Sequence, residues 1–163
     1  MADTDREITD RIWKIADRID PCLLVTRDGD RARVRPVYAR VRREEGLIYI
    51  LTDTGGTKIE QIEAHPEVAL SFADIRANDY VVIEGEARVS NDRAKIDELW
   101  RFSDESFWET PDNPDLRLIV VTPKGAELWD GSNWLVTGAK VLAERVAGAE
   151  VELVENAKVG EIR

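Results

Sequence analysis

Apolar residues show two different spacings along the chain. Near its start, Ile8, Ile12, Ile15 and Ile19 recur every three or four positions, which predicts an amphipathic helix over residues 6–19. Further on, apolar residues gather in short runs rich in valine, isoleucine and leucine, or alternate with polar ones, which predicts β-strands. The predicted strands span residues 22–26, 32–42, 47–51, 68–73, 80–89, 116–121 and 125–129.

Turn and breaker residues connect these segments. Asp28-Gly29 predicts a tight hairpin, and Pro123-Lys124-Gly125 predicts a second hairpin between the last two strands. Pro36 lies inside a predicted strand, where a proline indicates an edge, a bulge or a position that faces a ligand. Gly85 indicates a bulge or a bend in the longest of the strands.

Two short helices and a tail complete the pattern. One helix spans residues 57–65, because Pro66 disfavours helical geometry in the residue before it. A second helix is predicted over residues 93–102. In the tail, residues 138–146 read as a helix and residues 150–154 alternate like an exposed strand.

Short strands with antiparallel turns and only local helices predict a mainly β fold, a barrel or a roll. The chain has 163 residues and shows no internal repeat, low-complexity linker or change of composition. Residues 1–163 are therefore expected to form a single domain.

Composition and charge limit the binding partners and the cellular compartment that can be expected. A net charge of −10 argues against nucleic acid or anionic lipid as a partner. No apolar run is long enough to span a membrane, and the first residues are acidic rather than leader-like, so a cytoplasmic location is expected. The single Cys22 and the single His65 supply neither an internal disulfide nor an ordinary zinc site.

The segment from residue 50 to residue 66 carries the strongest candidate chemistry. A buried strand ends at the hydroxyl of Thr52, passes a Gly-Gly turn and restarts as a helix with Thr57 and Lys58 at its first positions. Helix starts leave backbone N–H groups unpaired, and a nearby ammonium group and hydroxyls would suit a phosphate monoester. Alternatively, Lys58 is a solvated surface lysine, Thr57 an N-cap and Thr52 an ordinary strand-end residue.

Seven arginines lie within the 17 positions from Arg27 to Arg43, against the acidic background. Most of them read as outward residues of a solvated hairpin. One or two could instead face a small anionic ligand, and Arg35 is the leading candidate because the following Pro36 indicates a specialised strand.

Three sequence blocks, taken in order, carry a resemblance to a known family. They are Arg35-Pro36-Val37; Thr52 with Thr57-Lys58 and Ile62-Glu63-Ala64-His65-Pro66; and Gly85-Glu86-Ala87-Arg88-Val89 with Asp92-Arg93 and Leu99-Trp100. In this order they resemble the flavin-binding split-barrel superfamily related to pyridoxamine 5′-phosphate oxidase. The chain is most similar to the general stress protein branch, whose later hairpin often carries a tryptophan where this chain has Leu128-Trp129-Asp130.

The resemblance implies a six-stranded antiparallel split β-barrel with peripheral α-helices, with a core at about residues 8–135 and a C-terminal extension at residues 136–163. It also implies a homodimer with FMN at the subunit interface. Carried over residue by residue, it nominates Arg35, Pro36 and Val37 beside the flavin ring and ribityl chain, Thr52, Thr57 and Lys58 at the phosphate, backbone groups of Ile50 and Leu51, and Trp129 as a wall that the partner subunit could lend. Arg35 could serve the pyrimidine edge of the ring or reach the phosphate, and the sequence does not separate the two roles.

The chain departs from the family pattern at three places. Val37 stands where the branch often has methionine, and Phe107-Trp108-Glu109-Thr110-Pro111 replaces an aromatic-Phe-Pro-x-Gly turn, so the slot is expected to differ in shape or to carry an acidic group. Pyridoxamine 5′-phosphate oxidase itself resembles a version of this pattern that has an arginine–histidine pair near its C-terminus. Because His65 is the only histidine here, oxidation of pyridoxamine phosphate is not expected.

The resulting hypothesis is an FMN-binding flavoprotein that oxidises or reduces an unidentified small molecule. No catalytic residue and no metal ligand stands out, as expected where a cofactor carries the chemistry. The alternatives are a non-catalytic protein that binds, stores or senses flavin under stress, or a relative that holds a deazaflavin or haem on the same barrel.

Overall fold

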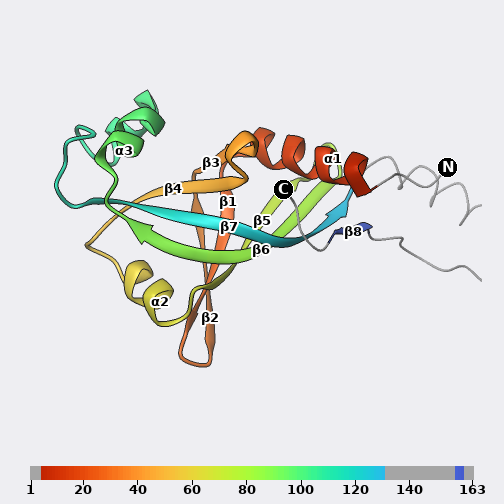
Figure 1. Ribbon diagram of the computed structural model, residues 1–163, viewed down its shortest axis with the longest axis horizontal. Helices are drawn as coiled ribbons and strands as arrows, with labels where there is room; N and C mark the ends of the chain where they lie inside the picture. Colours follow the sequence, from red (N-terminus) through yellow and green to blue (C-terminus); the bar gives the residue numbers. More distant parts are fainter. Residues whose placement is uncertain (1–4, 131–156, 160–163) are drawn as a thin grey trace, which may run out of the picture.

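A computed structural model describes residues 5–130 and 157–159 of the chain (Figure 1). The α-helices are α1 (Asp5–Arg18), α2 (Lys58–Ala64) and α3 (Arg93–Leu99), and the 3₁₀ turns are η1 (Arg43–Glu45) and η2 (Phe102–Ser106). The strands are β1 (Cys22–Asp28), β2 (Arg31–Val37), β3 (Ala39–Arg42), β4 (Leu47–Asp53), β5 (Glu67–Asp74), β6 (Asp79–Ser90), β7 (Leu116–Trp129) and β8 (Ala157–Val159). The helix expected over residues 138–146 and the strand expected over residues 150–154 lie outside the described residues.

All strand pairs in the sheet are antiparallel, so the predicted mainly β antiparallel class is confirmed. Seven strands follow the order β2-β1-β5-β6-β7-β4-β3, and β8 pairs with β7. The two edge strands of this path, β2 and β3, are consecutive in the chain and separated by Tyr38 alone. The sheet therefore curls back on itself, although within the described ranges β2 and β3 are not paired with each other.

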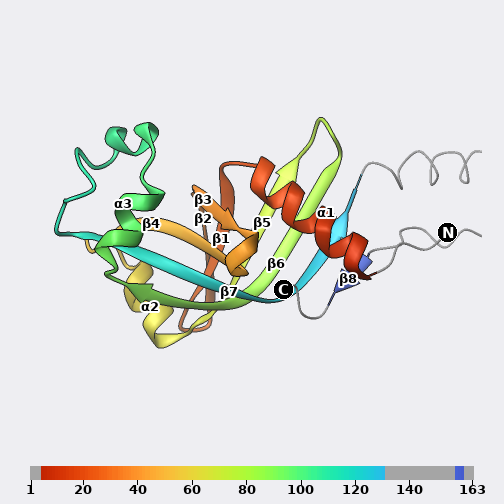
Figure 2. The ribbon, with the colours of Figure 1, turned by 45° about the horizontal axis from the view of Figure 1, so that its top comes forward.

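Strand β4 is buried on both faces, which explains its unbroken apolar run. Ile48 and Ile50 point into the core inside the curled sheet, together with residues of α1 and α2. Tyr49 and Leu51 point to the other face and pack in a second cluster under α3. Helices α1 and α2 lie at opposite ends of the sheet, and α3 lies near the end where β4 finishes (Figures 1 and 2).

The predicted strand over residues 32–42 is interrupted. Its first half is β2, which pairs with β1, and its second half is β3, which pairs with β4. Pro36 lies in the edge strand β2, where its missing N–H breaks no ladder, so the edge reading of this proline is confirmed. None of the helices in the described ranges has the length and apolar character needed to cross a membrane.

The predicted second hairpin is wrong, because residues 116–129 form the single strand β7. The ladder between β6 and β7 shifts register at Gly85, which pairs with Pro123, while Glu84 pairs with Gly125. Lys124 is therefore an extra residue on β7, and Pro123-Lys124-Gly125 forms a bulge rather than a turn. The bulge predicted at Gly85 is confirmed, and it accommodates a proline that cannot donate to the ladder.

A substitution at this bulge tests how closely β6 and β7 approach. A Cβ atom added at Gly85 would lie 2.5 Å from the backbone oxygen of Thr122, so one strand must move. We expect Gly85→Ala to lower the free energy of unfolding by about 1–3 kcal/mol, as overpacking usually does. Urea unfolding followed by tryptophan fluorescence would measure the change.

Gly56→Ala is the matched control, because an added Cβ there meets no atom within 4 Å. This variant should unfold at nearly the urea concentration of the unchanged protein. Equal midpoints for the two variants would contradict the close approach at Gly85.

Candidate functional site

The loop between β4 and α2 presents the predicted anion-binding residues. Thr57 is the N-cap residue of α2 and His65 its C-cap residue, as the sequence predicted. The hydroxyl of Thr57, however, makes no capping hydrogen bond and instead accepts one from Nε2 of Gln61 at 3.2 Å. Because α2 has only seven residues, the charge at this place comes mainly from side chains rather than from the helix dipole.

A buried polar network joins α2 to the β1–β2 hairpin. Nη2 of Arg35 donates to Oγ1 of Thr26 at 2.9 Å and to Oε1 of Gln61 at 2.8 Å. The hydroxyl of Thr26 donates to the same Oε1 at 2.7 Å. Thr26 and Gln61 are both buried, and Gln61 is only 7% exposed.

Sequence reasoning missed Thr26 and Gln61. The available signals were a hydroxyl on the inward face of β1, in line with Cys22 and Leu24, and an amide next to Ile62 on the buried face of α2. A polar group at an apolar position needs a hydrogen-bond partner, and here the partner is the arginine nominated by the sequence.

Lys58 and Arg35 are cations without a carboxylate partner among the described residues. Burial lowers the pKa of Lys58 from its usual 10.5, Asp53 opposes this shift, and the positive charge of Arg35 adds to it. Burial also lowers the pKa of Arg35, Arg33 adds to this shift, and the Asp28 carboxylate opposes it. Two desolvated cations that repel each other form a region that an anion would stabilise.

A cavity of about 280 Å³ opens beside Lys58. Four of the nine predicted site residues line it, namely Pro36, Val37, Leu51 and Lys58. The remaining lining residues are Tyr38, Arg40, Asp53, Asp104, Phe107 and Trp108. The cavity therefore lies at the junction of β2 and β3, between the end of β4 and the segment around η2.

The other predicted site residues lie around this cavity or away from it. Thr57 opens into a neighbouring hollow of about 180 Å³ that Gln61 also lines. Ile50 is in the core, with β3 and β7 paired on its two sides. Thr52 is 0% exposed, and its hydroxyl has no hydrogen-bond partner among the described residues.

Trp129 lies at the opposite end of β7 from the cavity. It pairs with Tyr80, whereas Leu116, the first residue of β7, pairs with Asp53 on the cavity lining. At about 3.3 Å per residue, β7 would measure roughly 40 Å if it were straight, so Trp129 lies far along this strand from its cavity end. Its predicted role as a wall stays a prediction that requires a second subunit.

Three aromatic side chains form one wall of the cavity. The rings of Tyr38 and Phe107 lie 5.8 Å apart, and those of Phe107 and Trp108 lie 5.7 Å apart. Nε1 of Trp108 donates to Oδ2 of Asp53 at 3.0 Å, which ties the wall to the end of β4. Trp108 also packs against the apolar cluster under α3, so it joins this cluster to the cavity.

A buried ion pair between Arg40 and Asp104 holds this wall. Arg40 is 1% exposed, and it also donates from Nη1 to the backbone oxygen of Tyr38 at 2.9 Å. Asp104 accepts from the backbone N–H of Arg101, and its own backbone oxygen accepts from the N–H groups of Phe107 and Trp108. The pair therefore fixes both Tyr38 and the segment that carries the other two rings.

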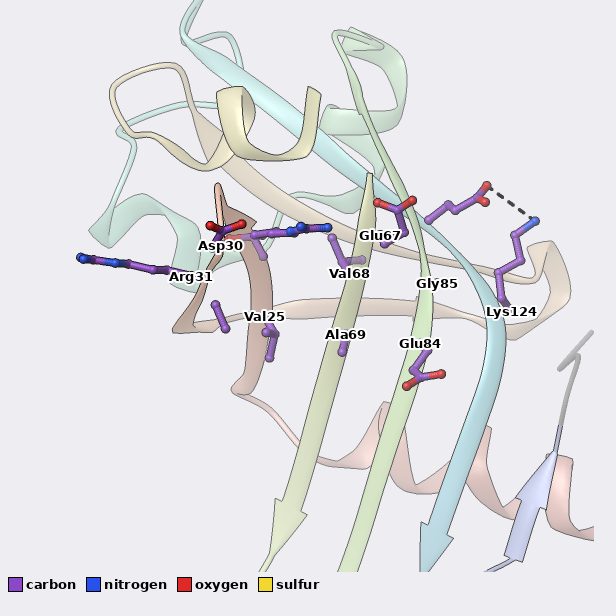
Figure 3. Close-up of a pocket in the computed structure, with 13 residues that line it drawn as sticks. Val25, Asp30, Arg31, Glu67, Val68, Ala69, Glu84, Gly85 and Lys124 are labelled. Atoms are coloured by element: carbon purple, nitrogen blue, oxygen red, sulfur yellow. Dashed lines mark ion pairs between the residues drawn. The ribbon is translucent and has the colours of Figure 1, made fainter. Parts of the chain in front are cut away.

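A larger hollow, of about 560 Å³, lies on the outer side of the sheet (Figure 3). Val25 of β1 and Ala69 of β5 lie within it, and Glu67, Glu84 and Lys124 stand around it. None of the nine predicted site residues lines this groove. Its size alone does not make it the site, because the desolvated cations and the aromatic wall belong to the smaller cavity.

Comparisons with known proteins agree on one family. The family model described as pyridoxamine 5′-phosphate oxidase like matches residues 7–152. No curated protein sequence gives a significant match.

Three solved structures show the same fold. General stress protein 26 from Bacillus anthracis strain Sterne is 22% identical, with a TM-score of 0.69 over 75% of this chain and 93% of that one. A protein from Clostridium acetobutylicum related to general stress protein 26 of B. subtilis is 12% identical, with a TM-score of 0.73 over 96% of each chain. The general stress FMN/FAD binding protein from Xanthomonas citri is 19% identical, with a TM-score of 0.68 over 94% of this chain and 97% of that one. At these identities the likeness concerns the fold.

Removing one partner of the Arg40–Asp104 pair tests its structural role. Arg40→Met leaves the Asp104 carboxylate buried and unpaired, and we expect a loss of about 3–5 kcal/mol in the free energy of unfolding. The double variant Arg40→Met/Asp104→Asn should recover part of this loss, because it removes the buried charge and keeps an acceptor for Arg101. Urea unfolding measures both.

Arg33→Met supplies the matched control. It breaks the ion pair with Asp28, in which both side chains are about half exposed (50% and 45%). Such a pair contributes at most about 1 kcal/mol. If Arg40→Met were no more destabilising than Arg33→Met, the buried pair would not hold the wall.

Proposed function

Because the chain belongs to the pyridoxamine 5′-phosphate oxidase-like family, we propose that it binds FMN at the cavity beside Lys58 and acts as a flavin-dependent oxidoreductase on a small molecule. The X. citri protein of the same fold, named as an FMN/FAD binding protein, supports a flavin as the cofactor. The proposal for this chain rests on its own residues.

The phosphate is the part of FMN that the residues fit best, and the observation that carries the proposal is the pair of desolvated cations Arg35 and Lys58. Neither has a carboxylate partner among the described residues, and the charge of Arg35 contributes to the lowered pKa of Lys58. A phosphate dianion would neutralise both and accept hydrogen bonds from them and from the exposed hydroxyl of Thr57. The unpartnered hydroxyl of Thr52 is a further donor near the end of β4.

The isoalloxazine ring would lie in the cavity lined by Pro36, Val37 and Leu51 on one side and by the aromatic wall on the other. A flavin needs a flat, mainly apolar slot, and these residues supply one. The volume of about 280 Å³ is at the lower limit for a small-molecule site. A second subunit that completes the slot would remove this shortfall, and Trp129 of that subunit is the proposed wall.

Arg35 is proposed at the phosphate rather than at the ring. Its Nη2 points to Thr26 and Gln61, beside Thr57, and it is not among the residues that line the cavity. Of the two roles that the sequence left open, this side-chain network supports the one at the phosphate.

The bound flavin would supply hydride or single-electron transfer. The chain itself would bind the phosphate, orient the ring and exclude water through the aromatic wall. Steady-state turnover with reduced nicotinamide and a panel of electron acceptors tests the oxidoreductase reading. FMN binding without turnover would instead favour the non-catalytic flavin-binding alternative.

A homodimer is proposed through the outer face of β1 and β2. Leu23 and Val34 are 44% and 58% exposed, and they lie opposite Pro36 and Val25 in the ladder. Directly opposed residues share one face of a sheet, so these four form an apolar stripe. Val25 at one end of the stripe lines the groove of Figure 3, and Pro36 at the other end lines the cavity. A partner on this stripe would stand beside the proposed flavin site.

We further propose that the curled sheet is the six-stranded split barrel of the family. Because only Tyr38 separates β2 from β3, the two would count as one bent strand, which leaves six strands around the core.

Lys58→Ala tests the phosphate assignment. We expect FMN affinity to fall by about 1.5–3 kcal/mol, the usual contribution of a hydrogen bond to a charged group. Riboflavin, which has the same ring but lacks the phosphate, should bind both proteins equally. Quenching of flavin fluorescence measures each dissociation constant. An unchanged FMN affinity would refute the role of Lys58, and no FMN binding by the unchanged protein would refute the flavoprotein proposal.

Val34→Arg tests the proposed dimer. A charge in the middle of the apolar stripe would have to be desolvated on association, so we expect the dimer to dissociate at micromolar concentration. Sedimentation velocity gives the mass of each species. Val34→Thr, which keeps the shape and stays neutral, should sediment like the unchanged protein, and a monomeric unchanged protein would overturn the proposal.

A further inference from the structure

We propose that Gln61 is a positioning residue that turns the free hydrogen-bond donors of Thr57 and Arg35 toward the cofactor phosphate. The inference rests on the proposed FMN site and adds to it a residue that neither the sequence motifs nor the family resemblance nominates. It follows from which group donates and which accepts each hydrogen bond in the buried network.

The orientation of the Gln61 amide is fixed by its neighbours. Its oxygen receives two donors, Nη2 of Arg35 at 2.8 Å and the hydroxyl of Thr26 at 2.7 Å. If the amide were rotated by half a turn, its NH₂ group would face the guanidinium, which has only donors to offer. The network therefore holds Oε1 toward Arg35 and Nε2 toward Thr57.

This orientation sets what the hydroxyl of Thr57 can do. Nε2 of Gln61 donates to Oγ1 of Thr57 at 3.2 Å, so the hydroxyl is an acceptor on its inner side. Its single proton stays available on the outer side, where Thr57 is exposed. A hydroxyl that presents its proton to an anion makes a charge-assisted hydrogen bond.

The same network sets the direction of Arg35. The two protons of Nη2 are used on Thr26 and Gln61, both of them neutral groups. The guanidinium thus keeps its charge. Within residues 5–130 and 157–159, nothing pairs with its remaining N–H groups, on Nη1 and Nε, so they are available to a ligand. Gln61 holds the arginine in place without neutralising it, which a carboxylate at this position would do.

The decisive substitution is Gln61→Glu, which keeps the shape and reverses the polarity. A glutamate would form an ion pair with Arg35 and would accept the proton of Thr57, so both donors would turn inward. We expect the dissociation constant for FMN to rise roughly 10- to 100-fold, the scale of losing a charged hydrogen bond. Riboflavin, which has no phosphate, should keep its affinity within about twofold, on the same reasoning.

Two further variants separate positioning from charge and from folding. Gln61→Met is neutral and breaks the network, and it should weaken FMN by a smaller factor, again without an effect on riboflavin. Ala94→Glu places the same charge at an exposed position of α3 that lines neither hollow, and it should leave both affinities nearly unchanged. Urea unfolding of each variant reports whether the fold is retained.

The outcomes are distinct. Selective loss of FMN affinity in both Gln61 variants supports the proposal. Equal loss of FMN and riboflavin affinity means that Gln61 only supports the fold, and unchanged FMN affinity in Gln61→Glu means that it positions nothing; either result overturns the inference while the FMN site stands. If the unchanged protein binds no FMN, the proposed function itself fails and this inference fails with it.

Discussion

The two edges of the sheet are tied together by the chain itself, since β2 ends at Val37 and β3 begins at Ala39. This connection forces the sheet to curl, and the curl encloses the core that Ile48 and Ile50 share with α1 and α2. It also creates a break in the ladder at Tyr38, where a backbone oxygen needs a new partner. Arg40 supplies that partner and at the same time pairs with Asp104. The cavity therefore lies where the topology requires the sheet to bend.

Arginines on this stretch of chain serve in three ways. Arg33 and Arg43 pair with Asp28 and Asp10 in exposed ion pairs, as expected for a solvated hairpin. Arg40 is buried, forms an ion pair with Asp104 and stabilises the fold. Arg35 bonds only to neutral groups and keeps its charge. Arg35 and Lys58 are thus half-buried cations that make no ion pair with the described residues, in a protein whose net charge is −10.

The sequence predicts local elements well where a single physical signal decides them. Pro66 ends α2, Pro36 marks an edge strand, and Gly85 marks a bulge, as the patterns indicated. The reading of Pro123-Lys124-Gly125 as a turn failed because a bulge and a turn use the same residues, and only pairing with β6 tells them apart. The site residues nominated within one segment, such as Thr57 and Lys58, stay predictions. Gln61 and the aromatic wall depend on contacts between distant segments, which spacing along the chain does not reveal.

Three departures from the rules of a stable interior meet at one end of β4. Thr52 buries a hydroxyl without a partner, which usually costs about 1–3 kcal/mol. Lys58 and Arg35 are desolvated next to each other, and Gln61 puts an amide on the apolar face of a helix. The two-sided burial of β4 supplies the stability that tolerates these costs. Unfavourable groups scattered over a structure would suggest nothing in particular. Gathered near one strand end, they support the proposal that an anion with several oxygen acceptors binds there.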